Sequence, residues 1–82
     1  MLIPLYGFLE GDTIGLLILA HDDWTMKEMA DTLVEMASVR VCPPPACHVV
    51  IDGRSVDNRR TVAEVGLAPL DRVDVRRGRD RP

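Results

Sequence analysis

The chain has 82 residues, of which 46% are hydrophobic and only 4% aromatic, and its formal net charge is −3. This size and composition predict one folded domain with an aliphatic core and argue against a disordered chain. The negative charge gives no support for a nucleic-acid partner. The one basic run, Arg76 to Arg81, is interrupted by Asp80 and has no aromatic neighbours, so we expect a solvated tail there.

An apolar stretch over residues 2–20 raises the question of an export signal or a membrane span. No basic segment precedes it, and Glu10 and Asp12 interrupt it. The uncharged part, Thr13–Ala20, is far shorter than the roughly 20 residues that a span needs. We therefore expect a cytoplasmic protein without membrane contact, whose cysteines are reduced.

The first elements are expected to be two strands joined by a tight turn. Leu2–Leu9 has the composition of a strand, with Pro4 at a position where no ladder hydrogen bond is needed. Glu10-Gly11-Asp12 has the composition of a hairpin turn. Thr13–Ala20 is expected to be the second strand, although it is apolar on both faces and shows no alternation.

Trp24–Ser38 is the segment whose periodicity most clearly predicts a helix. Thr25 as N-cap and Glu28 three residues later form a capping box, and Trp24 with Met29 can form a hydrophobic staple. The apolar positions follow the spacing of one buried stripe. These positions are Met26, Met29, Ala30, Leu33, Val34, Met36 and Ala37.

The second half of the chain predicts shorter elements. Three consecutive prolines, Pro43 to Pro45, favour an extended segment after the helix. Asp52-Gly53 predicts a tight hairpin between strands 47–51 and 54–56. A single helical turn follows, with Thr61 and Glu64 as a second capping box and Gly66 at its end. The last strand, 72–76, alternates, with Val73 and Val75 inward.

Together these elements predict an α+β fold, a mixed sheet with one long helix packed across one face. The last strand would run through the middle of the sheet beside the first. We expect a single domain over residues 1–77 and a flexible arginine-rich tail over residues 78–82. The order resembles the ubiquitin-like β-grasp. The resemblance includes Met1-Leu2-Ile3, Asp52-Gly53-Arg54 and Asp74-Val75-Arg76-Arg77-Gly78.

The sequence contains few groups that could carry chemistry. Cys42, Cys47 and His48 invite a zinc interpretation, but a closed site needs four ligands and His21 has no paired neighbour. Cys47 and His48 are adjacent in a strand and so point to opposite faces. Nothing near either cysteine promises a lowered thiol pKa. We therefore predict no catalytic residue, metal site or cofactor in this chain.

The surplus of apolar residues in the first two strands is the informative irregularity. A sheet with one face under a helix and the other in water should alternate, and these strands do not. Loops could cover the excess, but a contiguous patch on an edge hairpin is typical of a protein–protein contact. The predicted partner interface consists of Tyr6, Phe8, Leu16, Leu17, Ile18 and Leu19, with the buried face of the second strand left open.

A closer resemblance is carried by several segments. They are Phe8-Leu9-Glu10-Gly11-Asp12, Thr25-Met26, Val39-Arg40-Val41 before proline, Thr61 to Pro69, and Val73-Asp74-Val75. In these the chain resembles the small ubiquitin-like subunit (gamma, or system B) of bacterial toluene/aromatic multicomponent monooxygenases. The resemblance implies a non-catalytic companion of the hydroxylase large subunit, with the di-iron centre in that larger chain.

The alternative to such a subunit is a stand-alone ubiquitin-like interaction protein, of one of two kinds. One is an accessory protein of a secretion apparatus, which the fold would suit. The other is a modifier or sulfur carrier, which needs a terminal Gly-Gly, whereas this sequence ends Gly78-Arg79-Asp80-Arg81-Pro82.

Overall fold

A computed structural model describes residues 1–78 of the chain. In chain order the elements are β1 (Leu2–Leu9), β2 (Leu16–His21), α1 (Met26–Ala37), β3 (Cys47–Ile51), β4 (Arg54–Val56), α2 (Val62–Val65) and β5 (Arg72–Arg77). None of the helices within residues 1–78 is long and apolar enough to cross a membrane.

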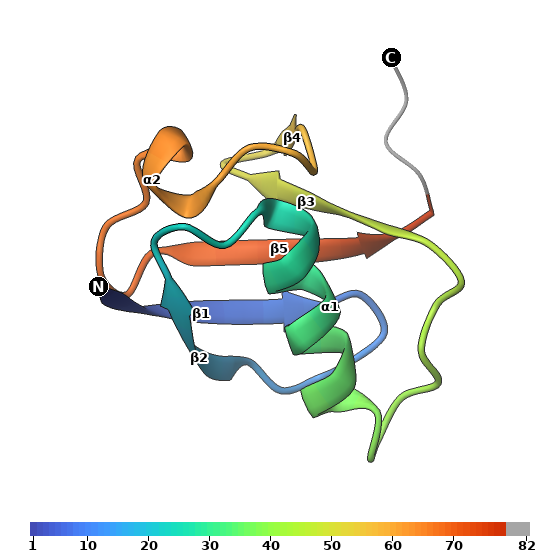
Figure 1. Ribbon diagram of the computed structural model, residues 1–82. Coiled ribbons are helices and arrows are strands. Elements are labelled where there is room, and N and C mark those ends of the chain that lie inside the picture. The colour runs from blue at the N-terminus through green and yellow to red at the C-terminus, as the bar shows by residue number, and fades with distance from the viewer. Residues whose placement is uncertain (79–82) are drawn as a thin grey trace.

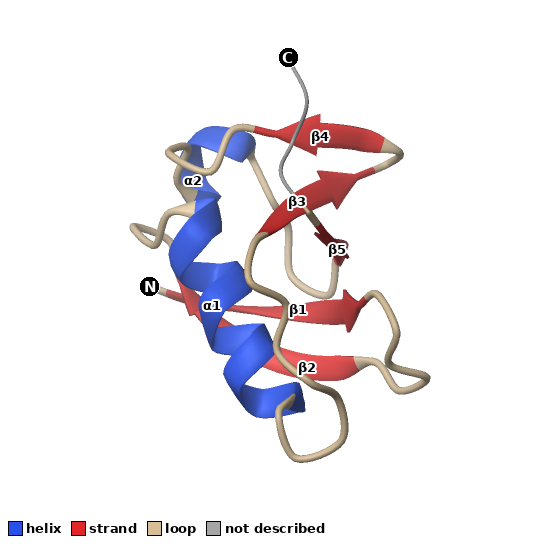
Figure 2. Cartoon of the chain, turned by 90° about the vertical axis from the view of Figure 1, so that its right-hand side faces the viewer, coloured by secondary structure: helices blue, strands red, loops and turns tan. Residues whose placement is uncertain are grey.

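The five strands form one mixed sheet in the order β2-β1-β5-β3-β4. The last strand lies between β1 and β3, parallel to β1 and antiparallel to β3, as Figure 1 shows. Helix α1 crosses one face of the sheet (Figure 2). The predicted arrangement, a β-grasp with the last strand beside the first, is therefore confirmed.

The core lies between α1 and the inner face of the sheet. From the sheet it takes alternate residues such as Leu5, Val73 and Val75, all fully buried. Pro4 lies before the point where β1 begins to pair with β5, at Tyr6 opposite Arg72, so its missing N–H leaves no ladder bond unmade.

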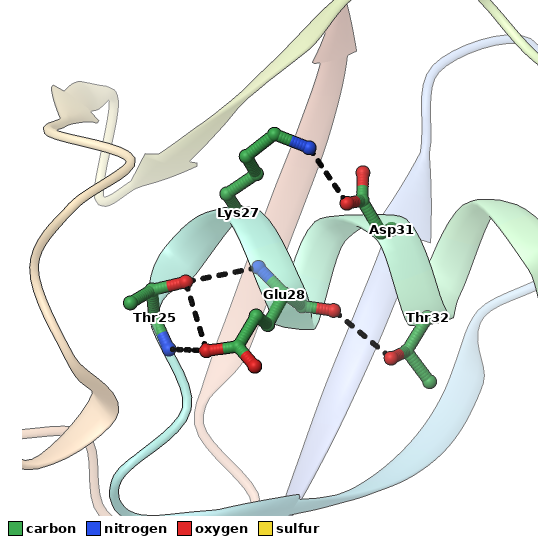
Figure 3. Close-up of polar contacts among 5 residues, drawn as sticks. All are labelled: Thr25, Lys27, Glu28, Asp31 and Thr32. Carbon is green, nitrogen blue, oxygen red and sulfur yellow. Dashed lines mark hydrogen bonds and ion pairs between the residues drawn. The ribbon is translucent and has the colours of Figure 1, made fainter.

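Helix α1 begins as the sequence predicts. Glu28 N–H donates to Thr25 Oγ1 at 3.2 Å and Thr25 N–H donates to Glu28 Oε1 at 3.0 Å, which completes the capping box (Figure 3). The inner stripe is buried, but the prediction that Met36 belongs to it is wrong, because this side chain is 39% exposed. Met36 lies at the margin of the stripe, near the end of the helix.

The predictions for the second helix and the second hairpin are confirmed. Thr61 and Glu64 form the second capping box, and Gly66 ends α2 with a φ of 81°. Asp52 and Gly53 both have positive φ, as a type I′ hairpin turn requires.

The predicted start of the second strand is wrong, since β2 begins at Leu16 and not at Thr13. The Asp12 carboxylate accepts the Ile14 N–H at 3.3 Å and the guanidinium of Arg40 at 2.6 Å, so the backbone here turns away from the ladder. Gly15 then lies against the ring of Phe8. Residues 10–15 therefore form a longer loop than the three-residue turn that we expected.

The basic run does not begin as a solvated tail. Arg76 and Arg77 belong to β5, and the Arg77 guanidinium donates to the carbonyl oxygens of Glu10 and Cys42 at 3.3 and 3.2 Å. Arg77 thus joins the β1–β2 loop to the segment after α1. Residues 79–82, which hold most of the predicted tail, lie outside the described residues.

Candidate partner interface

The antiparallel pair β1–β2, here called the ribbon, has one face in the core and one outside. On the outer face Tyr6 is 44% exposed, Leu17 51% and Leu19 56%. Tyr6 lies directly opposite Leu17, and Pro4 directly opposite Leu19. Because opposite side chains on one face of a sheet touch, these residues form a continuous surface.

Leu2 extends this surface toward the start of β1, and half of its side chain is exposed. Leu70 is also exposed and lies beside β1, since its N–H donates to Pro4 O at 2.6 Å. We call the surface formed by Leu2, Pro4, Tyr6, Leu17 and Leu19 the apolar patch. A contiguous apolar surface of this kind is typical of a site that another protein covers.

Two predicted interface residues lie on the inner face of the ribbon. Ile18 is 1% exposed within the core, and Leu16 packs partly buried against the core. The register places Ile18 opposite the buried Leu5, and Leu16, two residues earlier, faces the same inner side, so neither belongs to the exposed face that the prediction had in view. That pairing settles the open question of which face of the second strand is buried.

Phe8 lies on the outer side of β1 but is largely shielded within the chain. The Arg72 guanidinium sits 4.2 Å from the centre of its ring, a cation–π contact. A Cβ added at Gly15 would come within 2.5 Å of the same ring, so the β1–β2 loop closes over it. Phe8 therefore lies at the border of the apolar patch and is not one of its exposed members.

The outer face becomes charged on the neighbouring strand. Arg72 and Asp74 of β5 form an ion pair at 3.1 Å, and Arg76 follows on the same face. The apolar patch is thus bounded by a polar row along β5. This arrangement of an apolar centre and a charged border is common at protein–protein interfaces.

The two cysteines and the two histidines are the candidate metal ligands that the sequence offers. Cys42 is exposed, Cys47 is partly buried, and both are free thiols. His48 Nδ1 lies 2.9 Å from Gly78 O, and His21 packs beside the ring of Trp24. Within residues 1–78, no three His, Cys, Asp or Glu side chains are grouped so that they could hold a metal ion.

The surroundings of Cys47 do not favour a nucleophilic thiolate. Burial raises the pKa of the Cys47 thiol, and the nearby Asp31 carboxylate adds to that rise. A reactive cysteine needs the opposite, an environment that favours the thiolate.

Sequence reasoning missed a groove of about 590 Å³ between α1 and the segment before β3. Lys27 and Asp31 line one wall and pair with each other at 2.8 Å, while Pro44 and Cys47 line the other. Asn58 Oδ1 is buried near it without a hydrogen-bond partner among the described residues. Its walls come from segments far apart in the sequence, so no local signal could have revealed it.

Comparisons with known proteins place the chain in a family. The model of the family "Toluene-4-monooxygenase system protein B (TmoB)" matches residues 2–76. No match is found among curated protein sequences.

Solved structures share the fold. One is a chain of a toluene 4-monooxygenase HD complex with the inhibitor 4-bromobenzoate, with a TM-score of 0.88 and 22% identity over 95% of this chain and 100% of that one. The ubiquitin of Caldiarchaeum subterraneum matches with a TM-score of 0.79 and 14% identity over 100% of both chains. The ubiquitin-like domain of Plasmodium falciparum Dsk2 matches with a TM-score of 0.77 and 15% identity over 95% of this chain and 100% of that one. The fold is thus ubiquitin-like, and the chain belongs to the toluene-4-monooxygenase system protein B family.

Proposed function

We propose that this chain is the non-catalytic small subunit of a soluble toluene or aromatic-hydrocarbon monooxygenase hydroxylase, and that it docks on the large di-iron subunit. Family membership over residues 2–76 supports a place in such a system. The similar chain found in a toluene 4-monooxygenase complex supports it further.

The observation that carries the docking is the apolar patch. Leu17 and Leu19 leave more than half of their surface in water although the chain has a well-filled core elsewhere. Fully burying a leucine side chain is worth about 1.5–3 kcal/mol, so covering the exposed half of one contributes roughly half as much, and a partner that covers several of them gains a substantial part of its binding energy. Covering the patch is a function that needs no chemistry from this chain.

A division of labour follows from the same proposal. The iron ions and the oxygen chemistry belong to the partner large subunit, and this chain contributes packing. The grouping of side chains supports this division, since no three His, Cys, Asp or Glu side chains within residues 1–78 are placed to hold a metal ion.

Co-expression with the hydroxylase chains tests the proposal. With an affinity tag on the large subunit, we expect the wild-type chain to be retained through purification. Tyr6→Asp places a charge in the apolar patch and should abolish retention. Ser55→Asp makes the same kind of change on the exposed strand β4 and should leave retention intact.

If both variants fail to be retained, or if both are retained, the result would count against a specific role of the patch. Failure of the wild-type chain to be retained would reject the proposed function itself. Iron analysis of the purified chain alone should find no bound metal.

A further inference from the structure

Strand β2 is an outer strand of the sheet, and its hydrogen-bond pattern can be derived from the register. Asp22 N–H donates to Met1 O at 3.1 Å, and these two residues stand opposite each other when the β1–β2 register is continued by one step. In an antiparallel pair, such hydrogen-bonded partners alternate with non-bonded ones. The even-numbered residues of β2 therefore bond to β1.

The odd-numbered residues of β2 then direct their backbone N–H and C=O groups away from β1. The opposite edge of β1 supports this phase, since Tyr6 N–H and Glu10 N–H donate toward β5, to Asp71 O and Val75 O. Leu17 and Leu19 thus present backbone groups that no strand within residues 1–78 pairs.

The same two residues carry leucine side chains that are 51% and 56% exposed. Their unpaired backbone groups and their leucine side chains therefore lie along one line at the sheet edge. Thr13–Ala20 contains no charge and no proline, the devices by which proteins usually protect an edge from pairing with another chain. This edge is chemically complementary to an extended backbone with apolar side chains at alternate positions.

We propose that a strand of the hydroxylase large subunit, with apolar residues at alternate positions, adds to the free edge of β2 and extends the sheet. The inference rests on the proposed function and specifies how the docking occurs. Main-chain hydrogen bonds to Leu17 and Leu19 supply the direction and register of the added strand. Its outward side chains pack beside the two leucines and Tyr6.

The opposite edge of the sheet offers a matched control. Gly78 N–H donates to Ala46 O, which continues the β3–β5 register, so even-numbered residues of β3 bond to β5. Val49 and Ile51 then bond to Val56 and Arg54 of β4. Ser55 between them is left with an outward N–H, as Leu17 is on β2.

The experiment measures the dissociation constant of the reconstituted complex for four chains. They are the wild type, Leu17→Ala, Leu17→Pro and Ser55→Pro. Leu17→Ala removes the side chain but keeps the N–H donor, and we expect binding to weaken about tenfold. Leu17→Pro also removes the donor and blocks strand pairing, so binding should weaken at least about tenfold more. Ser55→Pro should bind like the wild type.

Amide hydrogen exchange on the unmodified chain tests independently whether a strand adds to β2, even if Leu17→Pro fails to fold. The amides of Leu17 and Leu19 should exchange quickly in the free chain and become protected in the complex. The amides of Leu16 and Ile18, already bonded to β1, should be protected in both.

Equal binding of Leu17→Ala and Leu17→Pro, with no new amide protection, would overturn the added strand while leaving the proposed function standing. Protection of Leu17 and Leu19 that appears in the isolated chain as its concentration rises would show a second copy at the edge, which also overturns the inference. Absence of wild-type binding would reject both proposals.

Discussion

The two hairpins of this molecule form opposite edges of one sheet, and the two edge strands differ in length and polarity. The β3–β4 hairpin ends in a strand of three residues, in which Arg54 and Ser55 are exposed. The ribbon ends in a six-residue strand without a charged residue from Leu16 to Ala20, and its outer leucines are exposed. One edge is protected in the usual way, by shortness and polarity, and the other is not.

The apolar outer face of the ribbon does not result from a lack of polar residues in this small domain. The same chain places Arg72, Asp74 and Arg76 on the outer face of β5, next to the apolar patch. Leu17 and Leu19 could have been polar without loss to the core, because they do not enter it. The proposed docking on another chain would account for their apolar character.

The largest effect is expected from the inner face of the ribbon. Ile18→Ala should lower the free energy of unfolding by about 2–5 kcal/mol, because it leaves a cavity in the core. Leu19→Ala, one residue away, should change it by less than about 0.5 kcal/mol. Urea denaturation of both variants measures the contrast, and similar losses would contradict the assigned phase of β2.

Binding should show the reverse contrast. Leu19→Ala should weaken association with the hydroxylase by about tenfold or more, close to 1.4 kcal/mol, because it removes an anchor from the centre of the interface. Val39→Ala serves as control, since Val39 is exposed but lies outside the patch, beyond α1. Calorimetry of both variants checks this, and an equal effect would mean that exposure alone governs binding.

The N-cap of α1 should affect stability but not association, and so separates the two quantities. Thr25→Ala removes the acceptor of the Glu28 N–H and should lower the free energy of unfolding by ~1 kcal/mol. Thr32→Ala is the matched control in the same helix. The Thr32 hydroxyl only donates to Glu28 O, already a helix carbonyl, so little change is expected. Equal effects of the two changes, or weakened binding by Thr25→Ala, would go against this assignment.

The smallest effect concerns the loop that leads into β2. The charge-assisted hydrogen bond from Arg40, followed by backbone N–H groups, lowers the pKa of Asp12. A carboxyl whose pKa is lowered by folding stabilises the fold fully above its ordinary pKa of about 4 and loses this contribution as the pH falls further.

We therefore expect the stability difference between the wild type and Asp12→Asn to be largest near neutral pH and to shrink below about pH 4. Thermal unfolding as a function of pH measures the difference. A difference that grows on acidification would contradict the sign of the shift.

The features that could be predicted from the sequence are those that residues close together in the chain determine. Both capping boxes, the Asp52-Gly53 turn and the alternation around Val73 and Val75 are short-range signals, and the structure confirms them. The order of elements then led to the β-grasp arrangement, because a last strand beside the first gives α1 a surface to cover.

The features that sequence reasoning missed depend on contacts between distant segments. The phase of β2 could not be read, because both of its faces are apolar and only its pairing with Leu5 distinguishes them. The shielding of Phe8 needs Arg72, and Arg77 bonds to Glu10, 67 positions away in the chain. No local pattern carries such information.

Radical footprinting of the chain, free and within the assembled hydroxylase, tests the central claim most directly. In the free chain Tyr6, Leu17, Leu19 and Val39 should all be modified, because all are exposed. In the assembly we predict that Tyr6, Leu17 and Leu19 become protected while Val39 remains reactive. Unchanged modification of the three ribbon residues in an assembly that contains the chain would contradict the claim that another polypeptide covers them.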